Sequence, residues 1–178
     1  MALSKIDAVN FLTGTIPSGN VANASLNAVT ALPGAIATGK VLQVVTGTSD
    51  SNTDTNSTSM VATSLTADIT PSATSSKIYV SVCSDLDSQA TGVQAFATIY
   101  RDSTNLANLG STYNFGNNFG AGSRVITPIS MSTLDSPSST SALTYKCYIK
   151  TGSGATTIKF NNQDVEGTIV LMEIAGWL

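Results

Sequence analysis

The side chains that could carry out chemistry are few in this sequence of 178 residues. It has no histidine, which removes the commonest general base, the usual serine-hydrolase triad and most zinc sites. Asp85 and Asp87 are two positions apart, as are Asp164 and Glu166. A glycosidase holds two carboxylates about 5–9.5 Å apart across its substrate, whereas we expect both of these pairs to be solvated turn residues. The sequence therefore predicts no catalytic residue and no enzyme.

Metal and cofactor sites are not expected either. Four oxygen-bearing residues alternate as in a calcium-binding loop: Asp50, Asn52, Asp54 and Asn56. However, Thr55 stands where the sharp turn of that loop requires glycine, and Val61 stands where the bidentate glutamate should be. Cys83 and Cys147 are too few for a thiolate zinc cluster. We expect two unpaired thiols in different strands, with a disulfide between them as the alternative.

One stretch, residues 113–123, has the composition of a binding loop. Six of its residues are candidate receptor contacts: Tyr113, Asn114, Phe115, Asn117, Asn118 and Phe119. Aromatic rings can cover the apolar faces of sugars, and amides can hydrogen-bond to their hydroxyl groups. The alternative is an ordinary long loop whose Phe115 and Phe119 pack into the end of the domain.

Composition limits the kind of partner. Charged residues make up 11% of the chain, against about 25% in ordinary soluble domains, so the polar surface must come from Ser, Thr, Asn and Gln. The net charge is −3 and the eight basic residues are scattered, which argues against nucleic-acid binding. No apolar run approaches the roughly 20 residues of a membrane span, and no secretory signal is expected at the N-terminus. These features favour an extracellular or virion-surface protein that is released by lysis.

The elements that would position these residues are strands. Alternating apolar and polar residues, separated by turn signals, predict about eight strands after residue 40: residues 40–46, 60–70, 77–84, 93–101, 124–134, 141–150, 156–161 and 167–175. Pro128 removes a donor from its strand, so that strand should lie at an edge or be bulged. The fold class predicted is all-β, an antiparallel jelly-roll-like β-sandwich over residues 40–178.

The closing stretch, residues 167–178, is apolar on both faces and should lie inside a sheet. Glu173 lies among its apolar residues. We expect it to reach water at the strand end, with an ion pair to Lys146 or Arg101 as the alternative. Trp177 and Leu178 extend past the strand, and a terminal Trp is costly to expose. We therefore expect these two residues to form a subunit or virion contact.

Residues 1–39 differ from the rest and form an extended N-terminal segment. Single apolar residues recur between small polar ones, and five of them are candidates for virion attachment: Ile6, Val9, Phe11, Leu12 and Ile16. A short helix over residues 20–30 is weakly indicated. The segment is too sparsely apolar to hold its own core. We expect it to pack against neighbouring copies or a larger partner, with folding back onto the same subunit as the alternative.

Short stretches after residue 40 resemble, in order and spacing, a family of phage fibre and virion-surface head domains. They are VLQVV at 41–45, ITPSATSSK at 69–77, IYRD at 99–102, PIS at 128–130, LDSP at 134–137, TSALTYK at 140–146 and LMEIA at 171–175. Upstream, LTGTIP at 12–17 is similar to the short repeats of phage tail-fibre shafts. Together they extend over about three quarters of the chain.

The resemblance implies a homotrimeric, jelly-roll-like head on a short N-terminal attachment segment. The expected function is that of a short tail fibre, made in the host cytoplasm, that binds a glycan or protein of the host surface from the virion. Its other partners would be virion proteins of the baseplate, fibre or capsid. The alternative is a capsid decoration or head-fibre protein anchored to capsomers through residues 1–39.

Overall fold

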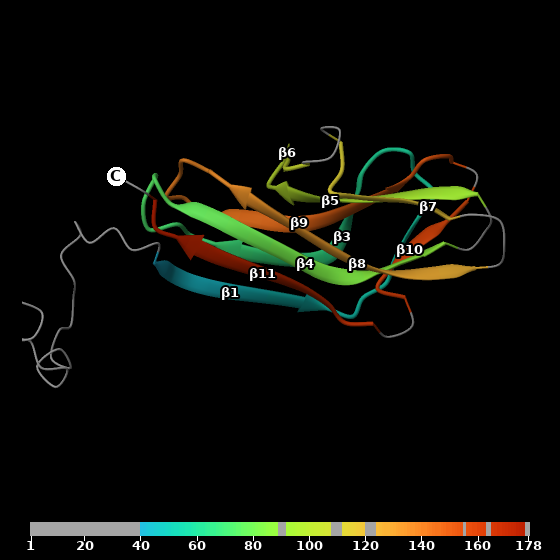
Figure 1. Cartoon of the computed structure of the whole chain (residues 1–178), viewed down its shortest axis with the longest axis horizontal. Coiled ribbons are helices and arrows are strands. Elements are labelled where there is room, and N and C mark those ends of the chain that lie inside the picture. The colour runs from blue at the N-terminus through green and yellow to red at the C-terminus, as the bar shows by residue number, and fades with distance from the viewer. Residues whose placement is uncertain are drawn as a thin grey trace, which may run out of the picture. The chain divides into compact units, whose positions relative to one another are not determined.

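The computed structural model describes residues 40–88, 92–107, 112–119, 124–154, 156–162 and 165–176, and for residues 117–119 the backbone alone. In these ranges the chain forms antiparallel strands in two sheets, and the two sheets face each other (Figure 1). The all-β prediction is confirmed. Residues 1–39, with the five expected attachment residues and the expected helix, lie outside the described residues, as do Trp177 and Leu178.

The first sheet, sheet A, is organised around its longest strand. That strand, β4 (Lys77–Ser88), pairs along one edge with β8 (Val125–Asp135). Its other edge pairs first with β11 (Gly167–Ile174) and then with the short β10 (Ile158–Phe160). The sheet continues from β11 to β1 and from β10 to β2; these strands are Val41–Ser49 and Thr53–Thr55.

The second sheet, sheet B, has the order β3, β9, β5. Its strands are β3 (Val61–Ile69), β9 (Leu143–Thr151) and β5 (Val93–Arg101). The free edge of β5 pairs with two shorter strands, β7 (Phe115–Phe119) and β6 (Thr104–Asn105).

The order of the eight longer strands is that of a jelly roll. The short β2, β6 and β10 are left out, and the remaining eight strands are numbered in chain order. Neighbouring strands in sheet A are then the first, eighth, third and sixth, and those in sheet B are the second, seventh, fourth and fifth. Two Greek keys wound in this way place the first and last strands side by side. The structure thus confirms the predicted jelly-roll sandwich and the interior position of the closing strand, which lies between β1 and β4.

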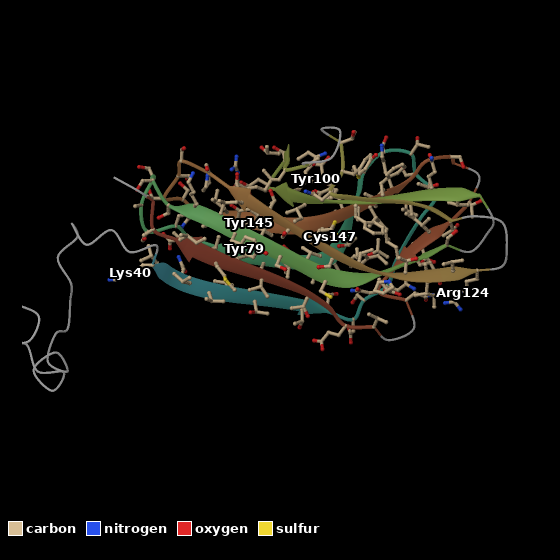
Figure 2. The ribbon with its side chains drawn as sticks, in the orientation of Figure 1. Lys40, Tyr79, Tyr100, Arg124, Tyr145 and Cys147 are labelled. Atoms are coloured by element: carbon tan, nitrogen blue, oxygen red, sulfur yellow. The ribbon has the colours of Figure 1, made fainter. Side chains whose placement is uncertain are left out.

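The core follows from the period of two in each strand. Ile78, Val80 and Val82 of β4 point inward and are fully buried. The small residues Ala95 and Ala97 of β5, in the other sheet, are fully buried in the same cluster. Tyr145 and Cys147 of β9 fill the space between the sheets (Figure 2).

Three loops expected from composition are partly strands. The polar stretch 47–59 contains the end of β1 and all of β2, and β4 continues through Ser88, beyond residue 84, where its strand was predicted to end. Residues 115–119, rich in Gly and Asn, form β7. In each case pairing with a neighbouring strand outweighs the low intrinsic strand propensity of the residues. Pro128 lies on β8, which pairs only with β4 in the described part of the chain, so the edge position is confirmed.

Candidate functional site

The expected receptor stretch lies beside β5 of sheet B. Its first residue, Tyr113, is half-buried, and Phe115 packs against the core. Asn117, Asn118 and Phe119 lie on β7 opposite β5 by backbone pairing, and their side chains are outside what the structure describes. The role of these residues in receptor binding stays a prediction.

Asn114 holds the local structure together. Its side-chain oxygen accepts hydrogen bonds from Thr98 Oγ1 at 2.7 Å and from the Ile99 amide at 2.9 Å. Its Nδ2 donates to the Leu106 carbonyl at 3.2 Å. Thr98 Oγ1 also lies 2.8 Å from Asn105 Oδ1. This network ties β5 to the chain at β6 and just before β7, so the Asn114 side-chain amide is already engaged within the protein.

Tyr113 instead forms part of an aromatic surface on the outer face of sheet B. Its ring lies 4.6 Å from that of Phe96, at an interplanar angle of 40°. The two rings lie over Gly116, where an added Cβ would come within 3.0 Å of both. Lys150 Nζ lies 5.3 Å from the centre of the Phe96 ring, a cation–π distance.

The surface continues along β5 and β9. The Tyr100 and Tyr148 rings stack with centroids 4.0 Å apart, and Tyr100 lies on the outer side of the sheet in Figure 2. Backbone register places Phe96 opposite Lys150, and Tyr100 opposite Lys146. We call this surface the aromatic–lysine face; it consists of Phe96, Tyr100, Tyr113, Lys146, Tyr148 and Lys150.

Most of the aromatic–lysine face is not identified from the sequence. Even spacing along a strand places side chains on one side of it. This holds for Lys146, Tyr148 and Lys150 on one strand, and for Phe96 and Tyr100 on another. What the sequence lacks is the register that sets β5 beside β9. Two adjacent strands carrying aromatics at alternate positions are the signal that would have suggested the site.

The outer face of sheet A carries a row of apolar residues. One line of paired residues crosses its four long strands: Val44, Met172, Tyr79 and Leu134. We call it the apolar row. Val44 and Leu134, at its two ends, are 56% and 55% exposed. Val41 and Leu42, just before Val44 on β1, are also exposed. None of these side chains carries a charge, whereas the aromatic–lysine face contains two lysines.

Glu173 corrects an expectation, because it does not reach water and meets no cation among the residues that the structure describes. It is fully buried on the inner face of β11. Ser72 donates to its Oε1 from both the amide, at 2.7 Å, and the hydroxyl, at 2.6 Å, and Ser76 Oγ donates at 2.6 Å. Gln43 Nε2 donates to Oε2 at 2.6 Å. Burial raises the pKa of Glu173, but the hydrogen bonds from Ser72, Ser76 and Gln43 outweigh it and lower the pKa to about 2.

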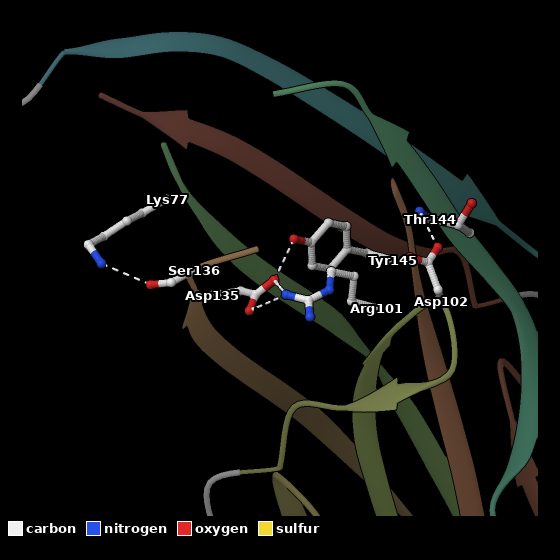
Figure 3. Close-up of polar contacts among 7 residues, drawn as sticks. All are labelled: Lys77, Arg101, Asp102, Asp135, Ser136, Thr144 and Tyr145. Carbon is white, nitrogen blue, oxygen red and sulfur yellow. Dashed lines mark hydrogen bonds and ion pairs between the residues drawn. The ribbon is translucent and has the colours of Figure 1, made fainter. Parts of the chain in front are cut away.

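A second buried carboxylate joins the two sheets (Figure 3). Asp135, on β8 of sheet A, accepts bonds from Arg101 Nη1 at 2.6 and 2.8 Å. The hydroxyl of the fully buried Tyr145 donates to Asp135 Oδ2 at 2.7 Å. Burial, together with this bond, raises the pKa of Tyr145. Arg101 and Tyr145 belong to β5 and β9, so this cluster connects sheet B to sheet A.

Asp85 and Asp87 are buried strand residues and not the solvated turn residues that were expected. They are 4% and 0% exposed on β4. Asp87 Oδ2 pairs with Arg124 Nη2 at 2.7 Å and accepts from Nδ2 of Asn162. The backbone N–H of Asn162 donates to Asp85 Oδ1 at 3.2 Å. Burial raises the pKa of Asp85, and the nearby Asp87 adds to the rise.

The cysteines are unpaired, as expected. Cys83 is exposed on β4 and Cys147 is buried on β9, in the other sheet. Burial raises the pKa of the Cys147 thiol to about 12. Asp54, from the calcium-like stretch, forms an ion pair with Lys159 at 3.1 Å.

Within the described ranges, no three Cys, Asp or Glu side chains are grouped so that they could hold a metal ion. The same residues include no helix with the length and apolarity to cross a membrane.

No protein-family model and no curated protein matches the sequence. Among solved structures, the chain is similar to parts of infectious bursal disease virus particles. For the Gx strain the identity is 15%, the TM-score 0.36, and the alignment covers 74% of this chain and 39% of that one. For the Gt strain the identity is 18% and the TM-score 0.34, with 75% of this chain and 38% of that one covered. For the T13 particle the identity is 14% and the TM-score 0.36, with 75% of this chain and 36% of that one covered. This chain thus spans less than two fifths of each of those proteins, and similarity at this level bears on neither its function nor its partners.

Proposed function

We propose that this protein is a phage virion protein, a short trimeric tail fibre whose jelly-roll head binds the host cell surface. The observation that carries the proposal is the jelly-roll strand order. It is formed by a chain with few charges whose short stretches resemble phage fibre heads. Folds of this type serve widely as capsid and lectin domains, although fold alone does not decide function.

Binding, with no chemical step, fits the side chains best. Three acidic groups, Glu173, Asp135 and Asp87, are buried and occupied by hydrogen bonds or ion pairs inside the sandwich. The outer faces offer aromatic, amide and apolar groups. Three copies on one fibre would bind a repetitive host surface more tightly than one copy, even if each contact were weak.

The apolar row supports self-association. Uncharged side chains cross all four long strands of sheet A, and contiguous exposed apolar surface commonly marks a protein interface. A second copy of the chain is the partner that the trimer requires. Residues 1–39, with Ile6 to Ile16 as the attachment stretch, would join the head to the virion.

The direct test is to locate the protein on purified virions with antibodies against the head, using electron microscopy. Label at the tail tip or baseplate is the expected result. Label over the capsid would identify a decoration or head-fibre protein instead, and virions without label would contradict a structural role. Incubation with host polysaccharide tests the non-enzymatic role, because released oligosaccharide would contradict it.

A further inference from the structure

We infer that the aromatic–lysine face on sheet B is a binding site for an anionic glycan, a polysaccharide carrying carboxylate or phosphate groups. This inference rests on the proposed function and deepens it by naming the site and the ligand class. It moves the expected receptor contact from the 113–123 stretch alone to the sheet surface that Tyr113 borders.

The first support is the half-buried state of the rings. Phe96, Tyr100 and Tyr148 belong to the outer face of the sheet, and each keeps part of its surface in solvent. Rings fixed on strands lose little conformational entropy when a ligand binds. Their partly exposed apolar surface suits the C–H faces of a sugar.

The packing of aromatic rings over glycines accounts for only some of the rings on the aromatic–lysine face. The Phe96 and Tyr113 rings fill the space above Gly116, and Phe96 also lies against Gly152, as aromatics do beside glycines in designed sheets. Tyr100 and Tyr148 have no such glycine beneath them in the described structure. Their hydroxyl groups form no hydrogen bond with any residue that the structure describes, so they can bond to a ligand.

The second support is charge. Lys146 and Lys150 flank Tyr148 on β9, and in the described ranges neither takes part in an ion pair. Two positive groups on one face stand out in a chain with eight basic residues and a net charge of −3. Two carboxylates are engaged at Thr144, two positions before Lys146 on β9: Asp68 accepts from Thr144 Oγ1 at 2.6 Å, and Asp102 accepts from the Thr144 backbone amide at 3.0 Å.

The third support is spacing. Lys146 and Lys150 are four positions apart on one strand, which corresponds to about 13 Å. Tyr148 lies between the two lysines on β9, and the ring of Tyr100, which is opposite Lys146 in register, stacks on it. A linear polysaccharide lying along β9 would therefore place anionic groups at both ends of this span and apolar sugar faces in the middle. A second copy of the chain fits less well, because its surface offers no comparable line of anionic groups in the described residues.

The experiment measures binding of the full chain to immobilised polygalacturonate, which carries carboxylates, to wall teichoic acid, which carries phosphates, and to neutral dextran. Biolayer interferometry at low and high NaCl gives the affinities. We expect binding to at least one anionic glycan, weakening with salt, and little binding to dextran. The two anionic probes distinguish carboxylate from phosphate recognition.

Matched variants locate the site. Tyr148→Leu, and separately Lys146→Gln with Lys150→Gln, should each weaken binding about tenfold, as expected for the loss of a central contact. On sheet A, Tyr79→Leu makes the same single change and Lys77→Gln removes one lysine; each should leave the affinity within about twofold. Sedimentation must show the same mass for every variant, so that loss of avidity is not mistaken for loss of the site.

Three results would overturn the inference: no binding to either anionic glycan, equal binding to dextran, or equal loss in the control variants. Failure of the inference is separable from failure of the proposed function. Virions that carry the protein while it binds no glycan would contradict the inference alone. Glycan binding by a protein absent from virions would contradict the proposed function alone.

Discussion

At the scale of single residues, Glu173 shows how a buried charge is tolerated. Four hydrogen bonds from Ser72, Ser76 and Gln43 replace the water that the carboxylate loses. Ser72 and Ser76 lie in the turn before β4, and Gln43 lies on β1. The carboxylate thus fastens this turn and the edge strand to β11, and its charge contributes to stability.

We predict that Glu173→Gln lowers the free energy of unfolding by about 3 kcal/mol at neutral pH. The substituted amide would direct an N–H group at a donor, because all present partners donate to the carboxylate. The pKa of Glu173 falls from 4.5 to about 2 on folding, so its stabilisation is complete above about pH 4.5 and is lost as the pH falls toward 2. Urea unfolding measured between pH 7 and pH 2 should therefore show the two proteins converging in acid.

The control for this prediction is Glu166→Gln, which removes the same charge from an exposed position. Its stability should stay within about 0.5 kcal/mol of the parent. A Glu173→Gln protein that keeps parental stability at pH 7 would show that the hydrogen-bonded carboxylate contributes nothing net.

At the scale of elements, the cluster of Arg101, Asp135 and Tyr145 connects the two sheets. We predict that Tyr145→Phe lowers stability by about 2 kcal/mol, because it removes a buried hydrogen bond to a charged group. Tyr148→Phe removes the same hydroxyl from β9, from a ring on the outer face, and should change stability by less than about 0.5 kcal/mol. Equal effects of the two substitutions in chemical denaturation would contradict the role of this cluster.

Period-two alternation predicted most strands and their inward faces, because burial on one side of a sheet imposes that pattern on the residues. It did not predict which strands become neighbours. The partners of Glu173 come from segments about a hundred residues away, and β7 is a strand because the free edge of β5 pairs with it. Asp85 and Asp87 were assigned to a loop because the sequence does not show which distant residues surround them. Their burial depends on Arg124 and Asn162, which the fold brings to β4.

At the scale of the whole molecule, the two outer faces differ in character. The apolar row on sheet A suits contact with a copy of the chain, and the aromatic–lysine face on sheet B suits a polar ligand. A head that associates through sheet A would leave sheet B open to solvent. Assembly and recognition would then use separate surfaces.

We predict that Val44→Glu and Leu134→Glu, made together, dissociate the trimer, since they bury charges in an apolar interface. Sedimentation should give the parent a mass near three times the 18.2 kDa of one chain, and the variant a mass near one chain. Ile126→Glu changes an exposed residue opposite Asp87, farther along β8, and should leave the mass unchanged. A variant that stays trimeric would exclude the apolar row as the interface, and a monomeric parent would contradict the trimer itself.

The position of β11 between β1 and β4 also has a consequence for how the protein is made. Gln43 and Glu173 touch across 130 positions of sequence, so sheet A stays divided while the ribosome adds nearly all of the head. Such non-local pairing slows folding, and the unpaired edges of β1 and β4 are open to aggregation during that time. A chain cut short before β11 could not close the sandwich. We therefore expect yield in the host to depend on temperature and chaperone supply more strongly than the stability of the finished head would suggest.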